Sequence, residues 1–211
     1  MTRAARLLIL GLAATSCTVR VAPSLERVGY PETTNETAAA LRAMNEPRLI
    51  PEQDTNNEAY RVLFYSGSNV ISVRIERAGQ RLVLIGKRLA LNPLDNLPKK
   101  VEKTRRVPLS PAQWDLFTHQ IARAGFWTMV SEEPLKYNDE GRLLVGLDGS
   151  TFVLEGASGG RRHVVLRWWH EDYPDFERAC HCLVIWSGVL KPVQPISPET
   201  RRTIQECTPG G

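Results

Sequence analysis

Residues 70–89, VISVRIERAGQRLVLIGKRL, contain two strand-like stretches around one tight turn. In the first stretch apolar and polar side chains alternate, which is the period of a strand with one buried face. The apolar positions are Ile71, Val73 and Ile75. Ala78-Gly79-Gln80 supplies the turn, and residues 81–89 return as the second strand. The pattern predicts an antiparallel hairpin.

Four further segments have strand composition and flank this hairpin. They are residues 60–65, 101–107, 143–155 and 162–169. The last two face each other across the glycine-rich stretch 156–160, which predicts a second hairpin.

Two helices are expected between and after these strands. Ser110-Pro111-Ala112-Gln113 is typical of a helix start, because serine caps, proline suits the first turn and glutamine completes a capping box. A second helix is expected from about Asp175 to Trp186, before Gly188. Together these elements predict an α+β fold, in which an antiparallel sheet of about six strands in hairpins carries two helices packed on one face.

The N-terminus, MTRAARLLILGLAATSC, has the order of a secretory signal. Arg3 and Arg6 form a positive segment, residues 7–14 form an apolar run, and small residues follow. The apolar run is too short to span a bilayer as a helix. We therefore expect export and removal of residues 1–16.

The end of this signal resembles a bacterial lipobox, in which small residues precede a cysteine that receives acyl chains such as palmitate. The matching residues are Ala14-Thr15-Ser16-Cys17, although the usual pattern prefers leucine where this chain has Ala14. The resemblance implies lipidation of Cys17, and ordinary cleavage near residues 13–16 is the alternative. Thr18, rather than aspartate, follows the cysteine. By the sorting rule of Gram-negative lipoproteins, this implies a cell-envelope protein of the outer membrane that faces the periplasm.

Composition divides the chain into four parts. Residues 1–16 form the signal peptide, 17–57 the lipidated cysteine and a flexible polar tether, 58–190 a single α+β domain, and 191–211 a proline-rich tail. Within the tether a helical fragment is expected at about residues 35–44. Within the tail, Ser197-Pro198-Glu199 is a possible short helix start.

The charge of the chain argues against nucleic acid as a partner. The net charge of +4 falls to +2 once Arg3 and Arg6 are removed with the signal. That excess is too small for a nucleic-acid-binding domain. The one basic cluster, within residues 99–106, alternates with valines and predicts a solvated strand face. The expected partners are therefore a membrane, through the lipid on Cys17, and an envelope protein.

The hairpin of residues 147–168 resembles an uncharacterised family of bacterial exported domains. The resemblance lies in Leu147-Asp148-Gly149, Leu154-Glu155-Gly156, His163-Val164-Val165 and Arg167-Trp168. It is supported by Tyr60–Tyr65 and by Phe126-Trp127, and it covers about residues 58–190. It implies a shared fold and carries no activity with it.

The same hairpin holds the candidate polar cluster, which comprises Asp148, Glu155, His163 and Arg167. Carboxylate, imidazole and guanidinium groups on one strand face suit binding or acid–base chemistry. The alternative is a polar sheet face with an ordinary ion pair between Glu155 and Arg162 across the turn. No nucleophile, base and orienting group can be identified together, so the sequence predicts no catalytic residue.

Three cysteines follow Cys17 and leave room for one disulfide in an oxidising compartment. We predict Cys182 with Cys207, with Cys180 and Cys207 as the alternative. Cys180 falls with Phe176 and Leu183 on one helix face, which predicts a buried thiol. Cys180-His181-Cys182 lacks a second ligand pair at zinc spacing, so neither a metal nor a cofactor is predicted.

Three functions remain open from the sequence. The first is an envelope-anchored lipoprotein with a non-enzymatic interaction or structural domain. The second is a periplasmic ligand binder or hydrolase that uses the polar face of residues 147–169. The third is an inhibitor of an envelope enzyme, which requires an exposed apolar patch on the sheet or in residues 168–174. The first two differ in whether the candidate cluster lines one pocket.

Overall fold

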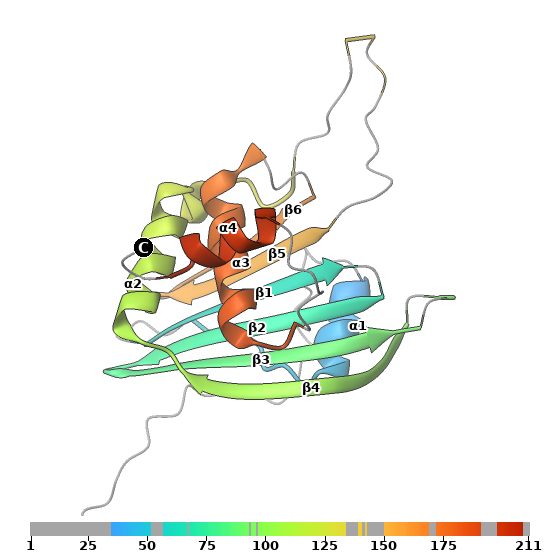
Figure 1. The fold of residues 1–211 in the computed structure, drawn as a ribbon, viewed down its shortest axis with the longest axis horizontal. Coiled ribbons are helices and arrows are strands. Elements are labelled where there is room, and N and C mark those ends of the chain that lie inside the picture. The colour runs from blue at the N-terminus through green and yellow to red at the C-terminus, as the bar shows by residue number, and fades with distance from the viewer. Residues whose placement is uncertain are drawn as a thin grey trace, which may run out of the picture.

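The computed structural model describes residues 35–51, 57–66, 68–92, 94–95, 97–133, 139–140, 142, 150–168, 172–190 and 198–208. They form a six-stranded antiparallel sheet in the order β4-β3-β2-β1-β5-β6, with helices on both faces (Figure 1). The strands are β1 (Asn57–Ser66), β2 (Asn69–Ala78), β3 (Arg81–Leu91), β4 (Pro98–Pro108), β5 (Thr151–Ser158) and β6 (Arg161–Arg167). The predicted α+β fold with its antiparallel sheet is thus confirmed.

The first face of the sheet, here called the helix face, carries α2 (Pro111–Arg123) and α3 (Pro174–Ser187). Its core is apolar and combines Phe117, Phe126 and Phe176 with alternate strand residues such as Val73 and Phe152. The predicted capping box at the start of α2 is present, and α3 ends at Gly188 in the left-handed conformation. The two helices predicted on one face are therefore α2 and α3.

The opposite face, here called the α1 face, is covered by α1 (Asn35–Ala43). Leu41 and Met44 pack on strand residues such as Leu63 and Val153, and all four side chains are buried. The sequence assigned this segment to the tether, and the structure corrects that assignment for residues 35–51. The helical fragment was expected, but its apolar side had no visible partner, because a strand pattern does not show what covers its second face.

Strand β1 lies in the middle of the sheet, between β2 and β5. Between Ala59 and Tyr65 both of its faces are apolar apart from one charged position, since Tyr60 and Val62 point to the helix face while Leu63 points to the α1 face. A strand covered on both sides tolerates charge only where the charge is paired. The exception in this stretch is Arg61, which is 1% exposed.

Residues 198–208 of the expected tail also belong to the fold, because α4 (Pro198–Glu206) packs against α3. The sulfur atoms of Cys182 and Cys207 lie at disulfide distance, as predicted for this pair. Trp186 donates its indole N–H to the Cys207 carbonyl over 2.9 Å, and Arg178 pairs with Glu206 at 3.3 Å. Cys180 is a free, fully buried thiol, and burial raises its pKa well above the usual range.

Candidate functional site

The sheet divides the residues of the predicted polar cluster between its two faces. Glu155 lies on the α1 face, whereas His163 and Arg167 lie on the helix face with Val165. Asp148 lies outside the described residues. The structure therefore does not bring Glu155 together with His163 and Arg167 in one pocket.

His163 and Arg167 bind the backbone of the segment that follows α2. The Nε2 of His163 lies 2.9 Å from the Met129 carbonyl oxygen, and Arg167 donates to the Val130 carbonyl over 2.8 Å. Arg167 also stacks on Tyr173, with 4.6 Å from its guanidinium carbon to the ring centroid. Burial lowers the pKa of Arg167, and Tyr173 counteracts this effect. Both side chains hold a loop against the edge strand β6.

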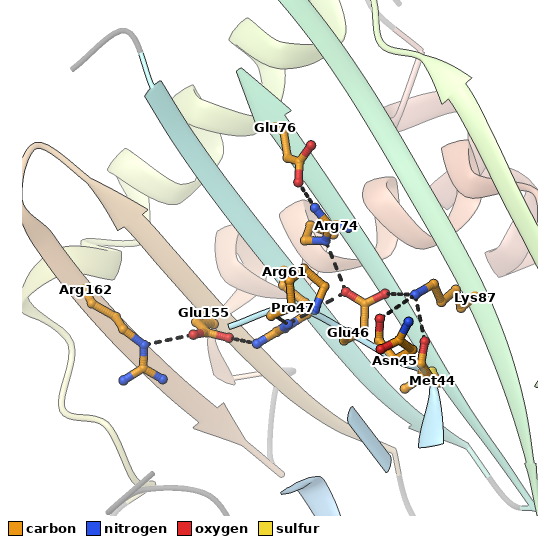
Figure 2. A network of polar contacts seen from close by, with 10 residues as sticks. All are labelled: Met44, Asn45, Glu46, Pro47, Arg61, Arg74, Glu76, Lys87, Glu155 and Arg162. Carbon is orange, nitrogen blue, oxygen red and sulfur yellow. Dashed lines mark hydrogen bonds and ion pairs between the residues drawn. The ribbon is translucent and has the colours of Figure 1, made fainter. Parts of the chain in front are cut away.

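Glu155 belongs to a buried charge network on the α1 face (Figure 2). Its carboxylate accepts from Arg61, directly opposite on β1, and from Arg162 on β6 over 2.8 Å. The predicted pair of Glu155 and Arg162 is thus confirmed. The two residues are diagonal neighbours, because Glu155 is registered with Val164.

The second carboxylate of this network is Glu46, which was not predicted. It follows α1, is 3% exposed and meets three cations from three different strands. Arg74 lies at 3.1 Å, Lys87 at 2.8 Å and Arg61 at 3.7 Å from its oxygens. Burial lowers the pKa of Arg74, and the adjacent Glu46 carboxylate opposes this shift.

Backbone carbonyls next to Glu46 complete the network. Arg61 donates to the Pro47 carbonyl over 2.6 Å, and Lys87 donates to the Met44 carbonyl over 2.7 Å. Arg74 also pairs with Glu76 on its own strand. Residues 44–47 are therefore clasped to β1, β2 and β3 by charge-assisted hydrogen bonds. We call Glu46, Arg61, Arg74 and Lys87 the α1 clasp.

A hollow of about 330 Å³ opens on the helix face beside α2. Trp114, Trp127 and Tyr60 line it together with Glu58 and Arg77. Its polar side chains contact one another, because the Tyr60 hydroxyl donates to Glu58 over 3.0 Å and Arg77 pairs with Glu58. Arg77 also lies over the Trp114 ring, at 5.2 Å from the centroid. We call this the aromatic hollow.

Tyr60 stays protonated in the aromatic hollow at neutral pH. Burial raises its pKa above the ordinary value, and the Glu58 carboxylate raises it further. A phenol in this state donates a hydrogen bond and does not act as a base. The hollow therefore offers aromatic surface and hydrogen-bonding groups, which suit binding of a polar ring compound.

Three searches add no relative. The chain matches no protein-family model, no curated protein and no solved structure. Within the described residues there is no group of three or more His, Cys, Asp or Glu side chains placed to hold a metal ion. None of the helices in that part of the chain is long and apolar enough to cross a bilayer.

Sequence reasoning missed the α1 clasp, although one signal was present. Arg61 is the only charged residue in the apolar stretch 60–65. A strand that is apolar on both faces and carries one arginine predicts a buried, paired charge. Nothing local marked Glu46, because its partners lie on strands that are distant in sequence.

Proposed function

We propose that this chain is a lipoprotein of the bacterial envelope, anchored through Cys17, whose domain is a non-enzymatic interaction or structural module. The observation that carries the non-enzymatic part is the fate of the polar side chains. Glu155 is held between Arg61 and Arg162, while His163 and Arg167 bind loop carbonyls on the other face. These groups are committed to structure rather than aimed at one reacting atom.

The N-terminal sequence and the cysteine pair support the anchored part. The signal-like residues 1–16 precede Cys17, and Cys182 and Cys207 lie at disulfide distance. Disulfides persist in oxidising compartments such as the periplasm. The α1 clasp fits the same proposal, because α1 is the element through which a lipid on Cys17 would be joined to the domain.

The test is the mass of the N-terminal peptide of the mature protein, purified from membranes of a bacterial host. We expect a peptide that begins at Cys17 and carries acyl chains. Cys17→Ala is expected to abolish acylation, while Cys180→Ala serves as a matched cysteine control that keeps it. A mature peptide that begins elsewhere without lipid would overturn the anchor, as would retention of residues 1–16 in a soluble protein.

The sorting part of the proposal has its own test. By the sorting rule of Gram-negative lipoproteins, an aspartate after the lipidated cysteine retains the protein in the inner membrane. Thr18→Asp is therefore expected to move the lipoprotein from the outer to the inner membrane. Thr18→Ser is the control and is expected to stay in the outer membrane. Density-gradient separation of the two membranes measures the outcome. An unchanged distribution of the aspartate variant contradicts outer-membrane sorting by this position.

The aromatic hollow favours a second candidate function, a periplasmic binder of a polar ring compound such as a sugar. Its aromatic lining is Tyr60, Trp114 and Trp127, and Ser158 of the 147–169 hairpin lies at its edge, whereas the predicted polar cluster does not line it. Titration with a peptidoglycan disaccharide, followed by tryptophan fluorescence, tests it. Saturable quenching that Trp127→Leu removes, and that Trp168→Leu leaves in place, supports this function. No saturable change in the unmodified protein excludes the disaccharide.

A further inference from the structure

The turn between β3 and β4 exposes two leucines at its tip. Leu94 is 93% exposed and Leu97 is 59% exposed. The nearby Val101 is 38% exposed, so this hairpin carries three of the seven exposed large apolar side chains found among the described residues. Isolated exposed leucines are ordinary on soluble proteins, but a group of them at one projecting end marks an interaction surface.

The tip is shaped by its own hydrogen bonds. The backbone of Asn92 donates to the Leu97 carbonyl over 2.9 Å, which closes the turn. Two side-chain acceptors complete it, since Leu94 N–H donates to Asn92 at 3.2 Å and Leu97 N–H donates to Asp95 at 3.0 Å. These bonds satisfy backbone groups inside the turn and leave the leucine side chains pointing outward.

Basic residues follow the leucines directly. Lys99 and Lys100 are exposed and follow Pro98 at the start of β4, and three more cations occupy the rest of that strand. The only acid on β4 is Glu102, which pairs with Arg88 at 3.0 Å. The acid at the tip, Asp95, accepts the Leu97 N–H. Apolar side chains at a tip with lysines at its base are the arrangement that contacts a lipid surface, because the lysines meet headgroups while the leucines enter the interface.

The tip also lies where the N-terminal segment enters the fold. Glu36, in the first turn of α1, lines a hollow of about 450 Å³ together with Asp95 and Leu97. Figure 1 shows α1 beneath the end of the sheet at which β3 turns into β4. A lipid carried by Cys17 would therefore join the domain at the end that bears the exposed leucines.

We propose that the β3–β4 tip, formed by Leu94 and Leu97 with Lys99 and Lys100, docks on an anionic phospholipid surface. The inference rests on the proposed envelope location, which brings a bilayer within reach of the domain. Docking of the tip would give the anchored domain one orientation relative to the membrane. The sheet would stand on its β3–β4 end, and the aromatic hollow would remain in solution.

Flotation with vesicles tests this proposal without any lipid anchor. The chain from Thr18 to Gly211 contains every element that the structure describes. We expect it to float with vesicles of phosphatidylethanolamine and phosphatidylglycerol, and to bind much less to phosphatidylcholine alone. The double variant Leu94→Asn with Leu97→Asn is expected to bind at least about tenfold more weakly, because leucine burial is lost. Lys99→Gln with Lys100→Gln is expected to lower binding about fivefold per lysine.

Matched controls come from α4, at a different place in the fold. Ile204→Asn replaces an apolar side chain of 38% exposure, and Arg201→Gln with Arg202→Gln removes two exposed cations. Both are expected to bind as the unmodified chain does. Equal thermal unfolding midpoints for the tip variants show that any loss of binding is local.

Several results would overturn the docking proposal. One is failure of the unmodified chain to bind anionic vesicles. Another is binding that needs the lysines but not the leucines, or that a duplex oligonucleotide competes away, since either marks a general polyanion site. The flotation assay is independent of Cys17. If the mature protein is acylated but the chain from Thr18 to Gly211 does not bind vesicles, the docking of the tip alone is refuted. If the tip binds vesicles as expected but the mature protein from the bacterial host carries no acyl chain at Cys17, the anchor alone is refuted.

Discussion

The two faces of the sheet are stabilised in different ways. The helix face buries an apolar core between the strands and α2 and α3, with Phe117, Phe126 and Phe152 at 0% exposure. The α1 face buries a charged row that runs from Lys87 through Arg61 to Glu155, beneath one short helix. The stabilisation from apolar burial is non-directional and roughly proportional to the area buried. The stability of a buried charge, by contrast, depends on the presence of each of its partners. The replacement of one charged residue should therefore be enough to detach α1 from the α1 face.

The largest contrast is expected from Glu46→Ala. It leaves Arg61, Arg74 and Lys87 without their shared carboxylate, and breaking a buried ion pair typically costs about 3–5 kcal/mol of unfolding free energy. Phe117→Ala on the helix face costs about the same, through a cavity. The two variants should differ in which part of the domain unfolds first. Glu46→Ala should release α1 first, and trypsin should then cleave at Arg42 and Arg48.

Urea unfolding and limited trypsinolysis measure this contrast. Glu140→Ala is the control, since Glu140 pairs with Arg142 at the surface and the exposed fractions of the two side chains are 65% and 80%. Exposed pairs contribute roughly 0–1 kcal/mol. If Glu46→Ala and Glu140→Ala unfold at the same urea concentration, the α1 clasp does not stabilise the domain.

The next effect concerns the outer layer of the helix face. Cys182→Ala with Cys207→Ala removes the link between α3 and α4, and a bond of this kind typically contributes about 2–4 kcal/mol. We expect early proteolysis within α4 while the α1 clasp stays protected. Treating the unmodified protein with a reductant should reproduce the loss. Cys180→Ala, the single-cysteine comparison, should respond to reductant as the unmodified protein does.

A smaller effect is expected at Gly156, where the helix face packs closely against the sheet. A Cβ added at Gly156 would lie 2.7 Å from Phe126 and 2.9 Å from Tyr60, both of which are buried rings. Gly156→Ala should therefore destabilise by about 1–3 kcal/mol through overpacking. Thermal unfolding measures it, and Ala157→Ser, on the other face of the same strand, is the comparison. An unchanged midpoint for Gly156→Ala would mean that the rings move aside freely.

The same contrast explains what the sequence could reveal. The elements of the helix face can be predicted from short stretches of sequence. The alternation in residues 70–77 predicts a strand, and the capping box at Ser110 predicts the start of a helix. The α1 face follows long-range pairing, since Glu46 meets Arg74 28 residues later. The candidate cluster was misjudged because period-2 alternation separates Glu155 from His163 and Arg167 once the register is known. Register depends on the turn, which the sequence located only approximately.

The smallest expected effect is a pH dependence that distinguishes the faces. Burial raises the pKa of Tyr60 on the helix face and of Tyr65 on the α1 face. The Glu58 carboxylate adds to the shift of Tyr60, whereas the hydrogen bond to Thr37 opposes that of Tyr65. A raised pKa in the folded state means that the folded protein holds the phenolic proton more tightly. The associated stability is complete below the unfolded value of about 10 and is lost as pH rises above it.

Unfolding free energies measured from about pH 8 to about pH 11, a range that includes the ordinary tyrosine pKa, therefore distinguish the two tyrosines. Tyr60→Phe should flatten the alkaline loss of stability more than Tyr65→Phe does, because the Glu58 carboxylate accepts a hydrogen bond from Tyr60 and raises its pKa. At Tyr65 the hydrogen bond with Thr37 lowers the pKa and opposes the effects of burial and of Glu36. Titration of lysines is common to all variants and cancels in the comparison. Equal slopes for both variants would mean that Glu58 does not act on Tyr60, and the aromatic hollow would then lack the protonated donor assigned to it.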